Sequence, residues 1–172
     1  SSPRRQRQMC IRDRIQTITI IGAGFIGLEI ATTALQLNKD VTIIENSENV
    51  MGRSISKDLS KWLINYYTKS GIKFIFNKSF KSFKSDENSK INVILSDGTK
   101  INSEMVLISA GSQPNDLLFK SIKVNEFNKI KVNSFLETNI NDIYAIGDCC
   151  FFDYYSKEVR LESIQNATDQ AK

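Results

Sequence analysis

The sequence contains no histidine and no Cys-x-x-Cys pair, and its three cysteines are Cys10, Cys149 and Cys150. Without histidine there is no imidazole to act as a general acid or base, and without a cysteine pair there is no redox dithiol or thiolate zinc site. An odd number of cysteines, two of them adjacent, does not indicate a disulfide framework. This pattern favours a reducing, cytoplasmic setting.

Long apolar runs are absent as well. No segment reaches the roughly 18 consecutive apolar residues that a membrane-spanning helix needs. No apolar segment follows the basic start in the way that a secretory signal requires. We therefore expect no membrane partner.

The net charge of +4 comes entirely from residues 1–14, which hold five arginines and one aspartate. Such an arm is typical of proteins that bind nucleic acid or an anionic membrane. However, Met9-Cys10-Ile11-Arg12-Asp13-Arg14 resembles a translated sequencing-library end, so we interpret residues 1–14 as a non-native leader that arose as a sequencing artefact. The rest of the chain is neutral, and we expect no nucleic-acid partner.

Strand-like and helix-like segments alternate in the first half of the remaining chain. β-Branched and apolar runs predict strands, and apolar residues at helical spacing predict helices. This order predicts an α/β, Rossmann-like fold, a parallel sheet with helices on both faces. The predicted strands are 15–21, 41–44 and 72–76, and the predicted helices are 25–37 and 54–70, the second of which stops at Gly71.

The hydrophobic period then changes to that of an antiparallel β-meander. Residues 80–85 and 91–95 are predicted strands, and Ser96-Asp97-Gly98-Thr99 contains the Asp-Gly pair of a hairpin turn. Shorter elements follow. They are strands at 105–109, 130–132 and 143–146, a helical turn at 116–120, and an uncapped helix at 162–172.

A glycine-rich segment, Gly22-Ala23-Gly24-Phe25-Ile26-Gly27, follows a predicted strand and opens a predicted helix. In that context Gly22 permits a tight turn, Gly24 lets a pyrophosphate approach the backbone, and Gly27 lets the helix pack closely on the sheet. The N-terminus of the helix then offers free N–H groups to the phosphates. The segment predicts a dinucleotide site, whereas alone it could be a structural strand–helix turn.

Glu45 completes this pattern, because it ends the second predicted strand about 20 residues beyond the glycine turn. A carboxylate there accepts hydrogen bonds from the ribose hydroxyls of adenosine and repels a 2′-phosphate. Neither Asn46 nor Ser47 is basic, and Arg53 is the nearest positive charge, either a contact to the cofactor or a surface cation. The sequence therefore predicts NADH in preference to NADPH.

Four motifs together resemble the pyridine nucleotide–disulfide oxidoreductase-like flavoproteins, in which an NAD domain is inserted within an FAD domain. They are Gly-Ala-Gly-Phe-Ile-Gly-Leu-Glu (22–29), Ser-Ala-Gly-Ser-Gln-Pro-Asn (109–115), Ile-Tyr-Ala-Ile-Gly-Asp (143–148) and Arg-Leu-Glu-Ser-Ile-Gln-Asn-Ala-Thr-Asp-Gln-Ala (160–171). The last motif is the most specific, and it resembles the ferredoxin reductase branch that serves rubredoxin and putidaredoxin-like ferredoxins.

The resemblance implies roles for further residues. Glu29, which also suits the helix dipole, would lie near the nicotinamide carboxamide, and Gly111 would lie close to bound NADH. In the flavin part, Asp148 after Gly147 would bind the ribityl hydroxyls, where otherwise it would cap a turn. A helix N-terminus would stabilise negative charge on the reduced flavin, or would be an ordinary surface helix. Its residues are Glu162, Ser163 and Ile164.

The resemblance implies an NAD-binding domain at 15–113 and a partial FAD-binding domain at 114–172. The implied activity is that of an FAD-dependent NADH:ferredoxin or rubredoxin oxidoreductase, which passes electrons to an iron–sulfur protein. The first FAD motif of the family, a second GxGxxG, is absent, so we expect a fragment that is inactive alone and holds FAD weakly. The alternatives are an NADH oxidase, a nitrite reductase flavoprotein, an apoptosis-inducing-factor-like flavoprotein, and a non-catalytic NAD-binding redox sensor.

Two groups of residues are interpreted as packing residues. Adjacent cysteines form only a strained disulfide, so Cys149 and Cys150 are expected to be buried without redox duty. Trp62 and Tyr66, at helical spacing with Leu59 and Leu63, are expected in the core beneath the second helix.

Overall fold

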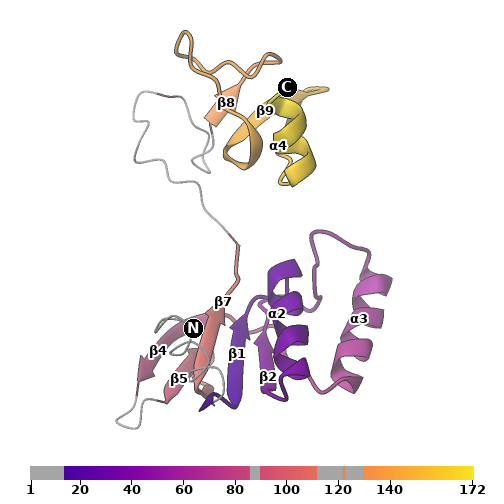
Figure 1. Cartoon of the computed structure of the whole chain (residues 1–172), viewed down its shortest axis with the longest axis vertical. Helices are drawn as coiled ribbons and strands as arrows, with labels where there is room; N and C mark the ends of the chain where they lie inside the picture. The colour runs from indigo at the N-terminus through magenta and orange to yellow at the C-terminus, as the bar shows by residue number, and fades with distance from the viewer. Residues whose placement is uncertain (1–13, 86–89, 112–121, 123–129) are drawn as a thin grey trace, which may run out of the picture. The chain divides into compact units, whose positions relative to one another are not determined.

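The structure, a computed structural model, describes residues 14–85, 90–111, 122 and 130–172. The chain divides into two compact units, residues 1–111 and 112–172 (Figure 1). Most of the predicted leader, the predicted turn at 116–120 and positions 112–115 of the proline–asparagine motif lie outside the described residues.

A four-stranded parallel sheet forms the centre of the first unit, with the strand order β3-β2-β1-β7. Its strands are β1 (Thr17–Ile21), β2 (Asp40–Ile44), β3 (Lys73–Ile75) and β7 (Met105–Ile108). Ile20 of β1 lies between Ile43 of β2 and Leu107 of β7. Every residue of β1 is β-branched, and its last three, Thr19 to Ile21, are buried. The carboxyl ends of β1, β2 and β7 meet at one edge of this sheet.

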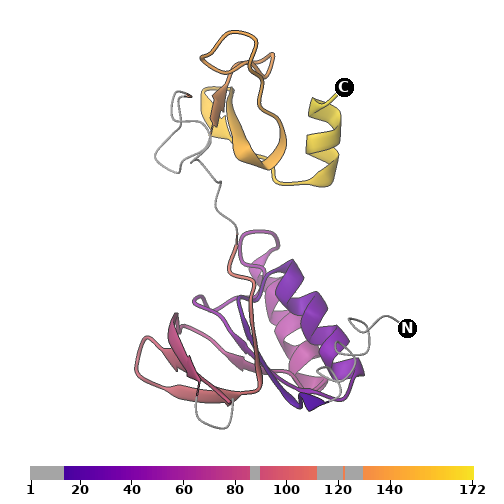
Figure 2. The same cartoon turned by 60° about the vertical axis from the view of Figure 1, so that its left-hand side comes forward.

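Two helices, α2 (Phe25–Gln36) and α3 (Lys57–Lys69), cover one face of the sheet (Figures 1 and 2). Helix α2 buries Leu28, Ala31 and Ala34, which recur at helical spacing. The side chain of Ser56 caps α3 by accepting from the N–H of Leu59, and Gly71, with φ of +106°, follows the end of that helix.

An antiparallel meander covers the opposite face (Figure 2). Its strands are β4 (Phe80–Ser85), β5 (Ile91–Leu95) and β6 (Lys100–Ser103), and the last of them had not been predicted. Val93 and Leu95 of β5 are fully buried with Ile44 and Ile21 of the parallel sheet. The expected Rossmann-like fold with a meander is confirmed. Helices on both faces had been expected, but among the described residues of this unit both helices lie on one face and the meander covers the other.

Trp62 and Tyr66 are not core residues, as had been expected, because 59% and 54% of their surfaces are exposed. Their rings stack on each other, with centroids 5.6 Å apart, along the outer side of α3. The helix turns a neighbouring stripe of side chains toward the sheet. In this stripe Ser60 is buried, and Leu63, Ile64 and Tyr67 pack partly buried against the core.

No helix in the described part of the chain is long and apolar enough to cross a membrane.

The second unit is built around a small three-stranded sheet of β8 (Ile130–Val132), β9 (Cys150–Tyr154) and β10 (Lys157–Val159). The predicted strand at 130–132 is confirmed. The predicted strand at 143–146 is wrong, because Tyr144 makes only an isolated bridge with Glu137. The β9–β10 hairpin was missed, since its turn has no glycine and instead places Tyr155 and Ser156 at positive φ. Helix α4 (Ile164–Gln170) ends with Ala171 as its C-cap, so the expected uncapped helix is also corrected.

At the end of β1 opposite the glycine turn, the side chain of Glu104 binds the backbone. Its carboxylate accepts hydrogen bonds from the backbone N–H groups of Gln16, at 2.6 Å, and Thr17, at 3.1 Å. These two bonds hold the pKa of Glu104 below its usual value.

Glu104→Gln is expected to make the first unit less stable at neutral pH. A carboxylate whose pKa is lowered by folding stabilises the fold above its unfolded-state pKa, and that stabilisation is lost as the pH falls toward the folded-state pKa. The difference in Tm between wild type and E104Q should therefore shrink below about pH 4.3. Thermal unfolding over a pH series measures this, with Glu48→Gln as a control whose exposed carboxylate accepts from the side-chain amide of Asn49 at 3.3 Å and approaches Lys57 at 3.9 Å, without any bond to a backbone N–H. A difference independent of pH would contradict it.

Candidate functional site

The glycine turn lies where β1 ends, between the ends of β2 and β7. Gly22 has φ of +102°, a conformation that favours glycine. Its N–H donates to the carbonyl oxygen of Ile44, at 2.8 Å, and a Cβ at this position would lie 2.7 Å from the carbonyl oxygen of Ser109. The turn therefore fits between its neighbouring strands only because it has no side chain.

The other two glycines of the turn differ from each other in their surroundings. A Cβ on Gly27 would overlap the carbonyl oxygen of Gly22, so this glycine allows α2 to approach the strand end. A Cβ on Gly24 would meet no atom within 4 Å, and Gly24 caps α2 without any side-chain hydrogen bond. Gly24 therefore leaves open space beside the start of α2, and a helix N-terminus beside such space can bind a phosphate.

Glu45 reaches the glycine turn from the end of β2. Its Oε2 accepts from the N–H of Ala23 at 2.9 Å, and its Oε1 accepts from the N–H and the hydroxyl of Ser47, both at 3.0 Å. Three donors therefore fix the orientation of the carboxylate. The structure brings the predicted ribose-binding acid and the predicted pyrophosphate turn into direct contact.

The remaining residues predicted to bind NAD surround this turn less closely. Phe25 and Ile26 begin α2 with 61% and 62% of their surfaces exposed, and Glu29 is exposed one turn later. Arg53 is exposed and pairs with no acid in the described part of the chain. Gly111 has φ of +95° and no atom within 4 Å of an added Cβ. The structure does not bring Arg53 or Gly111 into contact with Glu45.

Ser109 belongs to the site and had been placed only in a motif. Its hydroxyl lies 3.0 Å from the carbonyl oxygen of Ile21 and 3.1 Å from that of Gly22. Its N–H also donates to Ile21, at 2.8 Å, which continues the parallel ladder beyond β7. The sequence offered one signal for it, a polar residue directly after an apolar strand.

In the second unit, the predicted flavin-binding Asp148 lies in a 3₁₀ turn, Gly147–Cys149. Gly147 has φ of +72°, and a Cβ there would lie 3.2 Å from the Cβ of Ala167 in α4. Its N–H donates to the side-chain oxygen of Gln170 at 2.7 Å. The carboxylate of Asp148 is exposed and has no partner among the described residues, so it is free to accept hydrogen bonds from a ligand.

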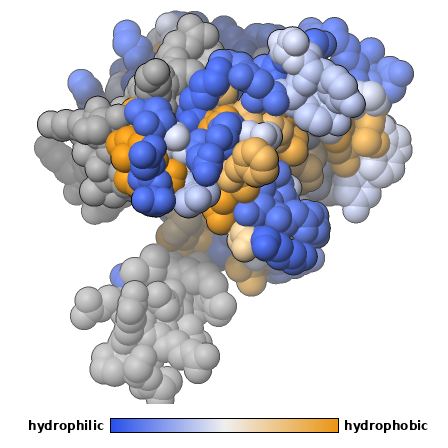
Figure 3. Space-filling model, turned by 90° about the horizontal axis from the view of Figure 1, so that it is seen from above, coloured by the Kyte–Doolittle hydropathy of each residue, from blue (hydrophilic) through white to orange (hydrophobic). Residues whose placement is uncertain are grey.

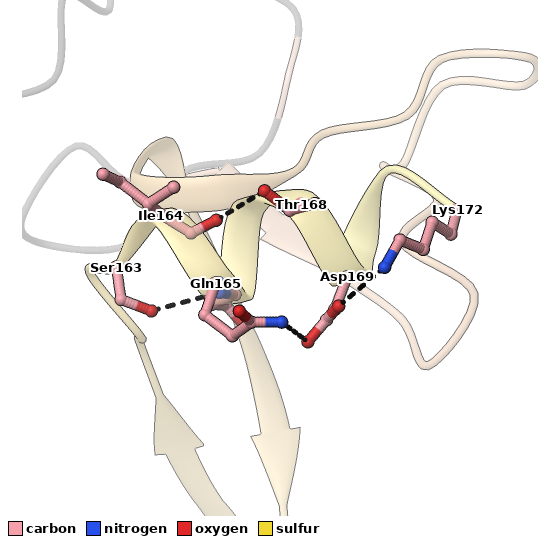
Figure 4. A network of polar contacts seen from close by, with 7 residues as sticks. Ser163, Ile164, Gln165, Thr168, Asp169 and Lys172 are labelled. Carbon is pink, nitrogen blue, oxygen red and sulfur yellow. Dashed lines mark hydrogen bonds and ion pairs between the residues drawn. The ribbon is translucent and has the colours of Figure 1, made fainter.

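Arg160 joins this turn to the start of α4. Its Nε donates to the carbonyl oxygen of Asp148 at 2.9 Å, and its guanidinium pairs with Glu162. Ser163 caps the helix by accepting from the N–H of Asn166 at 3.1 Å, and the side chain of Ile164 is 89% exposed. Figure 4 shows the cap together with the bonds along the outer side of α4. The predicted residues of both segments are thus brought together by Arg160 and Gln170, which the sequence had not singled out individually.

Gln170→Ala is expected to destabilise the second unit by about 1–2 kcal/mol, because it leaves the buried Gly147 N–H without an acceptor. Amide exchange at Gly147 and thermal unfolding measure the effect. Gln165→Ala is the matched control, since it removes only an exposed bond to Asp169 on the same helix (Figure 4) and should change stability by less than about 0.5 kcal/mol. Equal effects of the two substitutions would contradict the assignment.

The adjacent cysteines are both free thiols. Cys150 is buried, as expected, and burial, followed by the neighbouring Cys149, raises its pKa to about 11. Cys149 is exposed, which corrects the expectation that both pack inside. A protonated buried thiol is a poor nucleophile, so Cys150 is a packing residue.

The described residues contain no group of three or more cysteine, aspartate or glutamate side chains that could hold a metal ion. On the face seen in Figure 3, apolar surface is interspersed with hydrophilic residues. Among the described residues of the second unit, the large apolar side chains with the greatest exposed fraction are Ile164, Tyr155 and Phe135.

The sequence is similar to that of known proteins. Residues 3–171 match the family model described as pyridine nucleotide-disulphide oxidoreductase. The chain is 34% identical to rhodocoxin reductase of Rhodococcus erythropolis over 91% of its length, and 30% identical to putidaredoxin reductase of Pseudomonas putida over 95%. It spans 37% and 40% of those two proteins.

A solved structure, a ferredoxin reductase from Rhodopseudomonas palustris, superimposes on the chain with a TM-score of 0.86 at 29% identity. The match covers 96% of the chain and 42% of that structure.

Proposed function

Because the chain belongs to the pyridine nucleotide-disulphide oxidoreductase family, we propose that it is the NADH-binding part of an FAD-dependent NADH:ferredoxin or rubredoxin oxidoreductase. The observation that carries the proposal is the contact between Glu45 and the glycine turn. This contact sets a ribose acceptor beside a turn whose central glycine, Gly24, is open to a pyrophosphate. Bound FAD would supply the redox chemistry that links hydride transfer from NADH to single-electron transfer to an iron–sulfur protein.

For NADH, the residues proposed to act are those around the glycine turn. Gly22, Gly24 and Gly27 form the pyrophosphate turn, and Glu45 accepts from the adenosine ribose. Phe25, Ile26 and Glu29 face the cofactor from the start of α2, which exposes them. Arg53 and Gly111, both exposed, complete the proposed set.

For FAD, the proposed residues lie in the second unit. The exposed carboxylate of Asp148, which has no partner in the described part of the chain, fits the ribityl hydroxyls, and Gly147 lets it approach closely. The N-terminal end of α4 would face the flavin ring. Its residues are Ile164, the N-cap Ser163 and the preceding Glu162, and the exposure of Ile164 supports this arrangement. We assign residues 15–113 to the NAD-binding domain and 114–172 to part of the FAD-binding domain. The division of the chain after Gly111 supports this assignment.

The proposed electron acceptor is a ferredoxin- or rubredoxin-like iron–sulfur protein, and the proposed location is the cytoplasm. The printed names of the relatives, rhodocoxin reductase and putidaredoxin reductase, support an acceptor of this class. The free thiols of Cys149 and Cys150 support a reducing compartment.

The purified chain is expected to bind NADH but to retain no stoichiometric FAD, because its sequence contains a single GxGxxG turn and that turn opens the NAD part. Visible flavin absorbance of the purified chain, before and after incubation with FAD, measures this. A stoichiometric flavin spectrum would contradict the proposed division of the chain.

The activity itself is tested with a longer protein that contains this sequence together with a first FAD motif. NADH-dependent reduction of an added ferredoxin or rubredoxin is expected. A protein that binds NADH and FAD but reduces neither acceptor would favour a redox sensor. Reduction of oxygen alone would favour an NADH oxidase.

A further inference from the structure

One peptide group within the glycine turn, between Gly22 and Ala23, is held from both sides. The hydroxyl of Ser109 lies 3.1 Å from the carbonyl oxygen of Gly22, and the carboxylate of Glu45 accepts from the N–H of Ala23 at 2.9 Å. The two side chains follow β7 and β2, the strands that flank β1 in the sheet. We propose that Ser109 is a positioning residue which, together with Glu45, fixes this peptide in the orientation that NADH binding needs.

This peptide is the one in the turn that most needs to be fixed. Gly22 has φ of +102°, and glycine has no Cβ to restrict rotation of the adjoining peptide. A rotation of this peptide would exchange the positions of the Ala23 N–H, a donor, and the Gly22 carbonyl oxygen, an acceptor, beside the proposed pyrophosphate site. The N–H of Gly22 donates to the carbonyl oxygen of Ile44 at 2.8 Å, and the carbonyl oxygen of Ala23 accepts from the N–H of Met51 at 2.9 Å, so backbone groups hold the peptides on both sides. The Gly22–Ala23 peptide between them is held by two side chains instead.

Ser109 is well placed for this role because its own backbone is anchored. Its N–H donates to the carbonyl oxygen of Ile21 at 2.8 Å, and its half-buried side chain lies 2.9 Å from the position of a Cβ on Gly27. The hydroxyl therefore touches the turn near both its first and its last glycine. Its single proton is shared between the carbonyl oxygens of Ile21 and Gly22, at 3.0 and 3.1 Å.

Glu45 then has two functions, to accept from the adenosine ribose and to hold the Gly22–Ala23 peptide. Its Oε2 accepts from the N–H of Ala23, and its Oε1 accepts from the N–H of Ser47. The proposal rests on the proposed NADH site and adds a second residue to it, one that contributes without touching the cofactor. It implies that Ser109 and Glu45 are energetically coupled through a single peptide group.

The test is a double-mutant cycle on the full chain, with Ser109→Ala, Glu45→Ala and the double variant, in which affinities for NADH, ADP-ribose and adenosine are measured by calorimetry. Ser109→Ala is expected to weaken NADH and ADP-ribose by the same factor of about five, the equivalent of one net hydrogen bond, with little effect on adenosine, which has no pyrophosphate. In the Glu45→Ala background the same substitution should cost no more than about twofold.

Two further variants separate positioning from loss of stability. Ser103→Ala removes a hydroxyl that donates to the carbonyl oxygen of Met105 at 2.6 Å, just before the opposite end of β7, and should leave NADH affinity unchanged. Ser109→Cys keeps the side-chain volume but donates weakly, so it should behave as Ser109→Ala does.

The outcomes are distinct. If wild type binds NADH but Ser109→Ala binds it equally well, or loses the same factor in both backgrounds, the positioning role is overturned while the proposed function stands. If the wild-type chain binds no NADH, the proposed function fails, and the positioning role fails with it.

Discussion

Gly24→Ala is expected to weaken NADH binding at least about tenfold, or ~1.4 kcal/mol, while the first unit stays folded. A Cβ at Gly24 meets no protein atom within 4 Å, and the backbone there has φ of −80°, which alanine adopts readily. Alanine is a poorer N-cap than glycine, which costs no more than about 1 kcal/mol. The methyl group would nevertheless occupy the space that the pyrophosphate needs. Calorimetric titration with NADH and thermal unfolding measure the two effects separately.

Gly22→Ala is the matched comparison within the same turn. Its Cβ would lie 2.7 Å from the carbonyl oxygen of Ser109, and its φ of +102° strains any side chain. This variant should lose at least about 2 kcal/mol of stability and NADH binding with it. If Gly24→Ala lost stability to the same degree as Gly22→Ala, or kept full NADH affinity, the open side of Gly24 would not be the pyrophosphate site.

The double substitution Glu45→Ser with Asn46→Arg is expected to change the preference between NADH and NADPH by about a hundredfold, or ~2.7 kcal/mol, in favour of NADPH. It removes the carboxylate that would accept from the ribose hydroxyls and repel a 2′-phosphate, and it adds a bidentate donor for that phosphate. The N–H of Ser47, which donates to Glu45 at 3.0 Å, would also become available to a phosphate.

The two single variants separate the effect of removing the Glu45 carboxylate from the effect of adding an arginine that attracts the 2′-phosphate. Glu45→Ser alone should lose NADH affinity, and Asn46→Arg alone should gain little for NADPH because the carboxylate still repels the phosphate. Dissociation constants for both cofactors, measured for all four proteins at fixed salt, test this. A wild-type chain that already binds NADPH more tightly would show that Glu45 is not the ribose acceptor.

The order of strands and helices in the first unit could be predicted from the sequence because each element carries its own periodicity. Helix α2 places Leu28, Ala31 and Ala34 on one face. Helix α3 was harder, because it has two adjacent apolar stripes. The pattern located Trp62 and Tyr66 on one side, but only the packing of α3 on the sheet shows that the stripe with Leu63 and Tyr67 is the one that faces the core.

In the second unit the sequence misled where local signals were missing. Residues 143–146 are apolar like a strand, yet their neighbours leave Tyr144 only a single bridge. The β9–β10 hairpin has a turn that lacks the usual Asn-Gly or Asp-Gly pair, and it instead accepts positive φ at Tyr155 and Ser156. The residues of that turn therefore do not predict a hairpin.

The candidate site could be predicted where backbone geometry requires a particular residue type, as it does at the glycines of the turn. Gly22, Gly24 and Gly27 have the different surroundings that their positions in the motif require. The residues that hold the site could not be found in this way. Ser109 contacts Gly22 across a long separation in sequence, and Gln170 contacts Gly147 similarly, so both depend on the tertiary fold.

We propose that this chain carries an NADH site built from the glycine turn and Glu45. Parallel calorimetric titrations of the wild-type chain with NADH and NADPH test for that site. We predict one NADH per chain, with NADPH bound more weakly, and loss of the NADH signal in Gly24→Ala. Equal or tighter binding of NADPH, or no binding of NADH by the folded chain, would contradict the claim.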